Sequence, residues 1–494
     1  MARVADTVEP VESAQPRGRE LLKRRRTKIV ATLGPASNSV EVIERLVAAG
    51  VDVCRLNMSH GRHEDHRLAY ERVRAAAAKL GRPVAVLADL CGPKLRVGRF
   101  PGGAIDLPTG SRVVVTTRQV AGAPGLIPSD YPALADDVRP GDRILLDDGL
   151  LEFRVESVEG TEVVCAVVHG GVLKDRKGMN LPGVAVSAPS LTDKDREDAR
   201  FALDLGVDFV ALSFVRDAAD LAELKALMAG QPAQLIAKIE MPQAVEAIDE
   251  ILGACDGIMV ARGDLGVEMP PETVPIAQRR LLARARAHNK PAIVATQMLE
   301  SMVHHPRPTR AEVSDVSTAV FAGADAIMLS AETASGAHPV EAVAMMDRVA
   351  RWVESYQWEE GAFGSLAAAA DGVLRQPLSV AFAHATAQLS RDLRVRSIVV
   401  LSRTGMTAGV VASARPAAPV VVATDDASTC RRAALLWGVV PIQVNAADMK
   451  HPHALARQLV KRLGLAGGGQ YILTIGGFKA SPSETAPTLT PLSV

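Results

Sequence analysis

The sequence predicts an α/β protein: a closed (β/α)8 barrel with an inserted all-β lid domain and a C-terminal α/β domain. Three observations predict this fold. From residue 27 onward, near-continuous apolar runs alternate with helical stretches, as buried parallel strands alternate with their crossover helices. One long segment of different texture interrupts this alternation. A second α/β pattern follows the eighth strand–helix unit, and eight such units match one closed barrel.

The barrel strands are expected where apolar runs of strand length occur. Helical stretches such as 40–50 and 279–289 lie between them, and Thr192 and Thr309 have the character of helix N-caps. The eight expected strands are residues 28–34, 51–59, 83–90, 208–215, 234–240, 257–264, 292–298 and 325–332.

The interruption follows the third strand and predicts a separate small β-domain. Short alternating strands are expected at 112–117, 143–148 and 162–168, between Gly and Pro turns. Because this domain leaves the barrel at the C-terminal end of a strand, where barrel active sites lie, we expect it to act as a lid.

The third part is expected to be a doubly wound domain with strands near 397–402, 419–424, 439–444 and 471–476, after a loose Ala-rich connection at 361–372. The predicted organisation is a basic N-terminal tail (1–26), the barrel (27–93 and 190–357), a β-barrel lid (94–189) and the C-terminal domain (358–494).

Composition excludes several classes of function. Lys plus Arg equals Asp plus Glu at 56 each, and aromatic residues make up 3% of the chain, so neither nucleic acid nor a membrane surface is an expected partner. The five cysteines are scattered without a CxxC pair, which favours a reducing, cytoplasmic location. The sequence has no secretory signal and no apolar run of membrane-spanning length. The basic run 23–26 is interpreted as a solvated entry to the first strand, with a nucleic-acid tail as the alternative.

Glu240 and Asp264 are the most informative pair, because each ends an apolar run expected to be a strand. Lys238 lies two residues before Glu240 and therefore on the same face of its strand. Two carboxylates with water suit Mg²⁺, and a nearby ammonium suits an anion bridged to that metal. The alternatives are a buried salt bridge between Lys238 and Glu240 and an Asx turn at Asp264.

Polar residues end almost every expected barrel strand. Any single Ser, Thr or Glu among them could simply cap the next helix, but their convergence at one barrel end favours an active site. Zinc, P-loop and catalytic-triad signatures are absent from the sequence. The residues are Arg55, Asn57, Ser59, Asp89, Ser213, Lys238, Glu240, Asp264, Thr296, Ser330 and Glu332.

Several long motifs, in order along the chain, resemble the pyruvate kinase family. They are TKIVATLGP (27–35), RLNMSHG (55–61), GPKLR (92–96), KGMNLPG (177–183), KIE (238–240), IMVARGDLGVE (258–268), ATQMLESM (295–302), PRPTRAE (306–312) and IMLSAETASG (327–336).

The resemblance implies transfer of the phosphoryl group of phosphoenolpyruvate to ADP, giving pyruvate and ATP. It implies that Glu240 and Asp264 hold Mg²⁺ or Mn²⁺ and that Lys238 and Arg55 contact the phosphoryl group. The substrate carboxylate would lie against Ala261, Arg262, Gly263, Asp264 and Thr296.

The same resemblance places Thr296 and Ser330 on the proton route to the enolpyruvate carbon. It places Asn57, His60, Arg96 and Lys177 at the nucleotide. It also implies a homotetramer.

One departure from the family pattern concerns a monovalent cation. Asn57, Ser59 and Asp89 match the K⁺ site of many members, but Leu90 stands where those members have Thr and Lys94 where they have Glu. Because an ammonium can supply the charge that K⁺ brings, we expect that K⁺ is not required. The alternative is a surface lysine at a hinge.

The C-terminal domain resembles the family's regulatory domain. Ser402, Arg403, Thr404, Gly405 and Thr407 follow an expected strand and open a helix, which suits a phosphorylated effector; a plain helix cap is an equal alternative. Met406 and the segment 481–488 differ from the family pattern, so a sugar phosphate, a nucleotide monophosphate and no effector all stay open.

Two further functions are weighed against phosphoryl transfer. A Mg²⁺-dependent barrel lyase or aldolase acting on a 2-oxo acid enolate would share the carboxylate pair but would not need the inserted lid. A catalytically silent binding protein would have lost Lys238, Glu240, Asp264 or Thr296, and all four are present.

Overall fold

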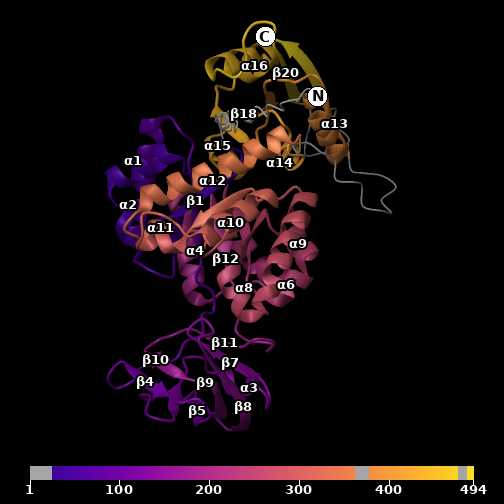
Figure 1. Cartoon of the computed structure of the whole chain (residues 1–494). Helices are drawn as coiled ribbons and strands as arrows, with labels where there is room; N and C mark the ends of the chain where they lie inside the picture. Colours follow the sequence, from indigo (N-terminus) through magenta and orange to yellow (C-terminus); the bar gives the residue numbers. More distant parts are fainter. Residues whose placement is uncertain (1–24, 362–377, 477–486) are drawn as a thin grey trace, which may run out of the picture.

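A computed structural model describes residues 25–361, 378–476 and 487–494. The chain forms three stacked parts: the C-terminal domain at one end, a barrel in the middle and a β-domain at the other end (Figure 1). The expected connection at 361–372 and most of segment 481–488 lie outside the described residues.

The middle part is the predicted barrel, and its eight parallel strands close in the order β1-β16-β15-β14-β13-β12-β3-β2. These strands are buried on both faces, which explains their unbroken apolar character. They are β1 (Lys28–Thr32), β2 (Val53–Asn57), β3 (Ala85–Asp89), β12 (Phe209–Leu212), β13 (Gln234–Ile239), β14 (Gly257–Ala261), β15 (Ala292–Ala295) and β16 (Ala326–Leu329).

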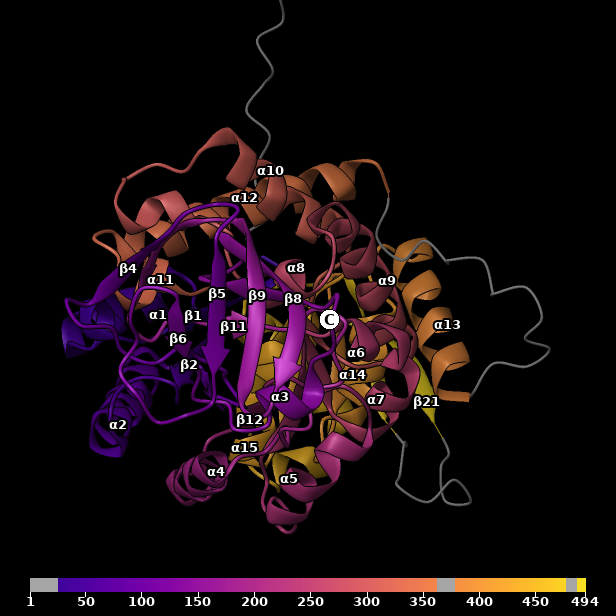
Figure 2. The same ribbon diagram turned by 90° about the horizontal axis from the view of Figure 1, so that it is seen from below.

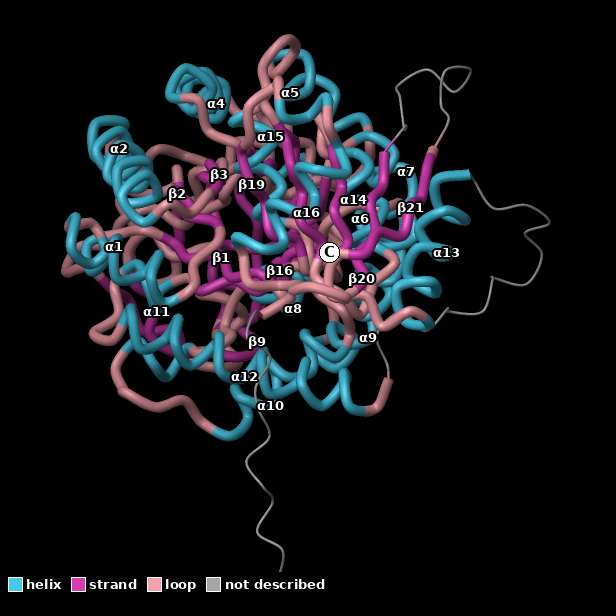
Figure 3. Tube along the Cα trace, turned by 90° about the horizontal axis from the view of Figure 1, so that it is seen from above, coloured by secondary structure: helices cyan, strands magenta, loops and turns pink. Residues whose placement is uncertain are grey.

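Helices surround the barrel, and three begin at capping side chains: Ser39, Thr192 and Thr309. They are α1 (Val40–Ala49), α2 (His63–Leu80), α4 (Asp193–Leu205), α5 (Ala222–Leu227), α6 (Pro242–Glu246), α7 (Ile248–Ala254), α8 (Arg262–Glu268), α9 (Val274–Ala287), α10 (Arg310–Phe321), α11 (Ala331–Ala334) and α12 (Pro339–Glu359). The ring that they form is visible along the barrel axis (Figure 3).

The prediction that Asp264 ends a strand is wrong. Strand β14 stops at Ala261, and Asp264 lies in the first turn of α8, which begins at Arg262. The Arg262 guanidinium donates to the carbonyl oxygens of Ala295 and Thr296, which ties the start of this helix to the end of β15.

The inserted domain covers the end of the barrel to which the strands' C-termini point (Figure 2). It was expected as a small β-barrel and consists of a six-stranded sheet beside a two-stranded one. The sheets comprise β4 (Ala104–Leu107) with β10 (Gly171–Lys174), and β11 (Met179–Asn180), β7 (Arg143–Leu146), β8 (Leu151–Glu159), β9 (Glu162–His169), β5 (Arg112–Thr116) and β6 (Leu126–Pro128), with a short helix α3 (Leu134–Asp137).

The C-terminal domain has a five-stranded sheet in the order β19-β18-β17-β20-β21, parallel except for the edge strand β21. The four predicted strands are present; β21 was not foreseen, because its sequence contains a proline and little apolar alternation. The elements are α13 (Leu378–Asp392), β17 (Ile398–Leu401), α14 (Met406–Ser413), β18 (Val420–Thr424), α15 (Ala427–Arg432), β19 (Val439–Gln443), α16 (Pro452–Arg462), β20 (Tyr471–Gly476) and β21 (Thr488–Ser493).

Four aspartates form a ring at the barrel floor, each directly before an even-numbered barrel strand. Each donates its backbone N–H to a carbonyl of the preceding odd-numbered strand and accepts the N–H of that same residue on its carboxylate. The pairs are Asp52 with Ile29, Asp208 with Val86, Asp256 with Leu235 and Asp325 with Ala292, with N–H to carboxylate distances of 2.8–3.1 Å.

The C-terminal domain docks on this aspartate ring. Arg431 Nε lies 2.7 Å from Asp208 Oδ1, and Arg415 Nη1 lies 2.8 Å from Asp325 Oδ1. Leu435, between α15 and β19, belongs to the apolar cluster that fills the barrel interior. The C-terminal domain therefore seals the barrel floor with one apolar side chain and neutralises its carboxylates with arginines.

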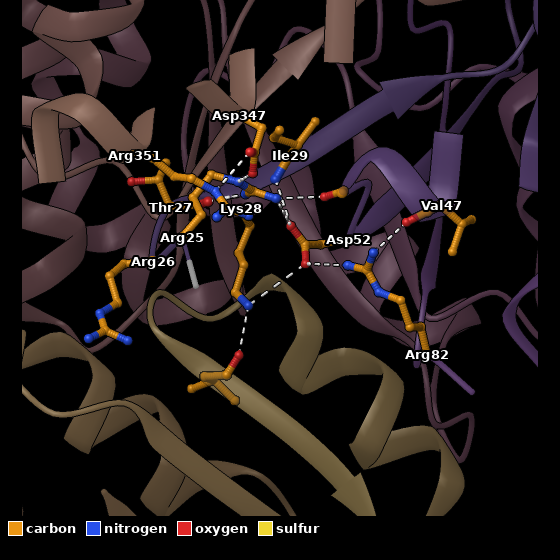
Figure 4. Close-up of polar contacts among 12 residues, drawn as sticks. Arg25, Arg26, Thr27, Lys28, Ile29, Val47, Asp52, Arg82, Asp347 and Arg351 are labelled. Atoms are coloured by element: carbon orange, nitrogen blue, oxygen red, sulfur yellow. Dashed lines mark hydrogen bonds and ion pairs between the residues drawn. The ribbon is translucent and has the colours of Figure 1, made fainter. Parts of the chain in front are cut away.

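The expectation that Arg25 and Arg26 form a solvated entry is wrong. The Arg25 side chain is 6% exposed and contacts Asp52 and Asp347 through Nη2 and Nε at 3.1 and 2.9 Å (Figure 4). Arg26 is also buried. A basic run appears solvated in a sequence, but here the chain fold brings Asp347, 322 residues away, to compensate the charge.

Within the described part of the chain, no helix has the length and apolar character needed to cross a membrane.

Candidate active site

A buried ammonium group lies at the centre of the barrel mouth. Lys238 Nζ is 2.9 Å from Glu240 Oε1, 3.3 Å from Asp89 Oδ1 and 2.6 Å from Ser213 Oγ. Burial alone would lower the pKa of Lys238, but the two carboxylates outweigh it and raise that pKa above its usual range. Lys238 is therefore a fixed positive charge and not a general base.

Arg55 provides a second cation beside the first. Its Nε donates to Asp89 Oδ2 at 2.6 Å, and its Nη1 donates to Thr32 Oγ1 at 3.0 Å. Burial opposes ionisation of Asp89, yet Lys238 and Arg55 hold the pKa of its carboxyl below the usual range. One buried carboxylate thus orients both cations toward the same opening.

Glu240 and Asp264 have the donor set for a divalent cation. Burial raises the pKa of Glu240, and the nearby Asp264 charge raises it further against the opposing effect of Lys238. Each oxygen of Glu240 already accepts one partner, Lys238 at one and the Phe214 N–H at the other, and keeps a lone pair for a metal. No group of three metal-ligating side chains occurs among the described residues, so two carboxylates with water or substrate oxygens are the set that fits.

The predicted carboxylate-binding backbone lies beside these charges. Gly263, in the first turn of α8, donates its N–H to Thr296 Oγ1 at 2.7 Å. Thr296 has φ of 71°, a strained conformation for a β-branched residue. Arg262 lies behind this turn, with Nη1 2.6 Å from Asp315 Oδ1, and it supports the backbone from the far side.

Ser330 lies between β16 and α11. Its N–H donates to Glu332 Oε2 at 2.7 Å, and Glu332 Oε1 accepts the N–H of Leu299 at 3.0 Å. The buried Glu332 therefore ties the loops after β15 and β16 together.

The residues assigned to the nucleotide come from both the barrel and the lid. Asn57 Oδ1 accepts the Ser59 N–H at 3.2 Å and thereby shapes the loop that carries His60. Burial lowers the pKa of His60, and the charges of Lys94, Arg96 and Arg55 lower it further. This positive surrounding suits an anionic ligand.

From the lid side, Lys177 forms a 2.7 Å ion pair with Asp147, and Arg96 Nη1 donates to the Arg176 carbonyl at 2.9 Å. Lys94 is exposed at the start of the lid. The structure does not bring Lys177 or Arg96 into contact with the mouth charges.

A cleft lies between the barrel and the lid, and of the carboxylates and cations at the mouth only Asp264 lines it. Its lining includes Lys94, Asp148, Asn180, Phe214, Asp264 and Glu268. Asn180 Nδ2 donates to Glu268 Oε1 at 2.8 Å, which ties lid strand β11 to barrel helix α8.

The proposed effector loop is closed by one of its own residues and by a side chain of α15. Gly405, with φ of 84°, donates its N–H to Ser402 Oγ at 3.0 Å, and Thr429 Oγ1 of α15 donates to the Arg403 carbonyl at 2.8 Å. Thr407 is buried in α14 and the Arg403 side chain is 74% exposed.

Sequence reasoning missed three parts of the site. It named Ser213 as a strand-end residue without a role, and it overlooked Phe214 and Thr32. The position of Ser213 and Phe214 directly after β12 is the signal that could have identified them.

Comparisons with known proteins agree with this geometry. Residues 24–343 match the family model "Pyruvate kinase, barrel domain", and residues 380–490 match "Pyruvate kinase, alpha/beta domain". A pyruvate kinase of Geobacillus stearothermophilus is 46% identical over 84% of this chain and 71% of its own length. Pyruvate kinases of Corynebacterium efficiens (47% identity, 84% of this chain, 86% of its own length) and Mycobacterium intracellulare (44%, 86% and 90%) are similarly related.

Proposed function

The chain belongs to the pyruvate kinase family and transfers the phosphoryl group of phosphoenolpyruvate to ADP, and we propose that the charges at its barrel mouth carry out this transfer. The observation that carries the proposal is the continuous set of contacts from Arg55 through Asp89 and Lys238 to Glu240.

Arg55 and Lys238 bind the phosphoryl group of the substrate. Phosphoryl transfer depends mainly on positioning and on electrostatic stabilisation of the spreading negative charge. Asp89 supplies the positioning, because it holds both cations from below. The permanently charged Lys238 also stabilises the developing enolate oxygen.

Glu240 and Asp264 hold a divalent cation, Mg²⁺ or Mn²⁺. When bound there, the cation supplies Lewis-acid polarisation of substrate oxygens. The raised pKa of Glu240 supports this assignment, since burial and the nearby Asp264 charge together outweigh the positive charge of Lys238.

The backbone from Ala261 to Gly263, with Thr296, receives the substrate carboxylate. Because the Gly263 N–H is bonded to Thr296 in this structure, the incoming carboxylate exchanges one hydrogen bond for another. Thr296 and Ser330 then convey the proton that the enolpyruvate carbon takes up.

Asn57, His60, Arg96 and Lys177 bind ADP when the lid closes. The positive surrounding of His60 supports the position of the diphosphate. Lid closure brings Arg96 and Lys177 inward, exchanges the Lys177–Asp147 ion pair for contacts with phosphate, and excludes the water that competes with ADP as acceptor.

Lys94 takes the place of a monovalent cation, so K⁺ is not required. The lowered pKa of His60 supports this assignment, because Lys94 contributes to the positive potential beside Asn57 and Ser59. Asp89, the remaining member of the K⁺ set, is already balanced by Arg55 and Lys238.

The wider setting is that of a cytoplasmic homotetramer. Exposed aromatic side chains on α10 and α12 support assembly, since they occur in a chain with 3% aromatic residues. They are Phe321, Trp352, Tyr356 and Trp358. A phosphorylated effector binds the loop from Ser402 to Thr407, where Gly405 gives the turn that precedes α14.

The test is formation of both pyruvate and ATP from phosphoenolpyruvate, ADP and Mg²⁺ by the purified chain, with Lys238→Met as the inactive control. Release of pyruvate from a 2-oxo acid substrate without ATP would instead indicate the lyase alternative. Family membership already argues against that alternative.

A further inference from the structure

Two consecutive residues after β12, Ser213 and Phe214, contact both segments that connect the lid to the barrel. The outgoing connection follows β3, and the returning connection precedes α4. Ser213 Oγ donates to the carbonyl of Leu90 at 2.6 Å, on the outgoing connection. Ser190 Oγ, on the returning connection, donates to the carbonyl of Phe214 at 3.1 Å.

The same two residues contact both groups of opposite charge at the mouth. Ser213 Oγ accepts from Lys238 Nζ at 2.6 Å, and the Phe214 N–H donates to Glu240 Oε2 at 2.7 Å. A hydrogen bond to a carboxylate is among the stronger ones in proteins, so the position of Glu240 follows the Phe214 backbone.

The backbone of Phe214 is held in a strained conformation. Its φ is 55°, in the left-handed region that a bulky residue rarely enters. Packing holds it there: a Cβ on Gly92 of the outgoing connection would lie 2.8 Å from Phe214 Cδ2. Gly92 is itself fixed through its N–H to Asp195 Oδ1 at 3.1 Å.

The returning connection is fixed by Arg216, two residues further on. Its Nη1 donates to the Val186 carbonyl at 2.6 Å, its Nη2 to Ser190 Oγ at 3.3 Å, and Asp220 holds the guanidinium at 2.9 Å. Motion of either lid connection therefore reaches the Phe214 peptide through buried, directed contacts.

We propose that Phe214 is a positioning residue that couples lid position to the placement of Glu240, with Ser190 as its link to the lid. Closure moves the returning connection, Ser190 shifts the Phe214 carbonyl, and the N–H of the same residue re-aims the carboxylate that binds the cation. The proposal rests on the roles assigned above to Lys238 and Glu240.

The test uses Ser190→Ala, which removes the link and touches neither catalytic charge. Ser187→Ala, three residues earlier on the same connection, is the matched control, because its partners Tyr131 and Asp137 belong to the lid. Ser190→Thr keeps the hydroxyl and should restore the wild-type values.

We expect Ser190→Ala to lower kcat about tenfold with a smaller change in KM for phosphoenolpyruvate. We also expect its Kd for Mn²⁺ alone, by calorimetry, to weaken roughly 3–10-fold, less than the about 10–100-fold typical for direct loss of an outer partner of a metal ligand, because Ser190 acts on Glu240 through the Phe214 peptide. Hydrogen exchange in peptides covering 209–216 should accelerate in Ser190→Ala and stay unchanged in Ser187→Ala.

If Ser190→Ala has the same kcat, Mn²⁺ affinity and hydrogen exchange as the wild type, the coupling is overturned. Turnover by the wild-type enzyme in the same assay would leave the proposed function standing. Absence of turnover in the wild type would instead count against the proposed function. If Ser190→Ala does not fold, wild-type exchange decides: Mn²⁺ should protect 209–216 and 186–192 together, and protection of one without the other refutes the coupling.

Discussion

The backbone N–H of Gly263 donates a 2.7 Å hydrogen bond to Thr296 Oγ1, across the junction of two neighbouring βα loops. Thr296 Oγ1 also lies 2.6 Å from the Ala295 carbonyl. A substrate carboxylate that uses the Gly263 N–H must displace this hydroxyl, which is then free to contact the substrate itself.

Thr296→Ala should therefore separate binding from turnover. The Gly263 N–H loses its partner and becomes available, so we expect KM for phosphoenolpyruvate to change less than threefold. The proton donor is lost, so kcat should fall at least about 100-fold, within the usual range for acid–base groups. Thr296→Ser is the control and should retain most of kcat in steady-state assays; equal loss in both variants would contradict the assignment.

Lys238→Met should fold but lose most turnover. The substitution removes the ammonium that balances Asp89 and Glu240 and leaves two carboxylates facing one another. We expect kcat to fall by more than 1,000-fold and the free energy of unfolding to fall by roughly 3–5 kcal/mol, as when one partner of a buried pair is removed. Circular dichroism and urea denaturation check the fold, and near-normal kcat would reject the role of Lys238.

The wild-type enzyme should be active without K⁺, and Lys94→Glu should acquire K⁺ activation. The substitution exchanges a fixed positive charge for a carboxylate close to His60, and a monovalent cation then restores the balance. Rates in tetramethylammonium buffer with and without K⁺ measure the effect. Many-fold activation of the wild type by K⁺ would refute the proposal.

Lys28 predicts a pH dependence of stability at the barrel floor. Its Nζ donates to the Val439 carbonyl of β19 at 2.7 Å, and burial lowers the pKa of Lys28 to about 8 against the opposing effect of Asp52. Between pH 8 and about 10.5 the unfolded chain binds this proton and the folded chain does not, so Lys28 makes stability rise with pH there.

Urea denaturation of the wild type and Lys28→Met tests that dependence. The difference in free energy of unfolding, wild type minus variant, should be flat below pH 8 and rise by no more than ~3 kcal/mol toward pH 10.5. Lys79→Met, on the exposed side of α2, is the control for loss of a lysine. A difference that falls with pH would contradict the burial of a charged Lys28.

Arg415→Met should loosen the C-terminal domain. It leaves Asp325 buried without the guanidinium at 2.8 Å and removes a cation placed 4.9 Å above the Trp437 ring. We expect a loss of about 3–5 kcal/mol in unfolding free energy. Adding Asp325→Asn should recover part of that loss, because the uncompensated charge disappears. If the double variant instead lost more unfolding free energy than the two single variants added together, the ion pair would not explain the effect.

The barrel and most of its mouth could be predicted because both follow from local pattern. Buried parallel strands are recognisable one by one, and their C-termini must converge, so Arg55, Lys238, Glu240 and Thr296 were placed at one end before any coordinates. Asp264 was placed on the wrong element because the apolar run was extended through Arg262 and Gly263, whereas the strand stops at Ala261.

What escaped prediction depends on contacts between distant segments. Arg25 was predicted to be solvated because its partner Asp347 is distant in the sequence. Phe214 has a left-handed backbone that its sequence does not indicate. The aspartate ring was detectable in part, since Asp52 and Asp208 each precede a strand by one residue. That these residues lie together at the barrel floor follows only from the register of the paired strands.

The seal at the barrel floor limits how independently the domains can evolve or be exchanged. A chain cut after α12 would lose Leu435 from the barrel interior and the arginines of Asp208 and Asp325 together. The barrel would then carry a hydrophobic opening beside an Asp325 without its cation, whereas Asp208 would keep Arg74 and Asp52 would keep Arg25. Any foreign domain grafted in its place must supply an apolar plug for the barrel interior and a cation for Asp325.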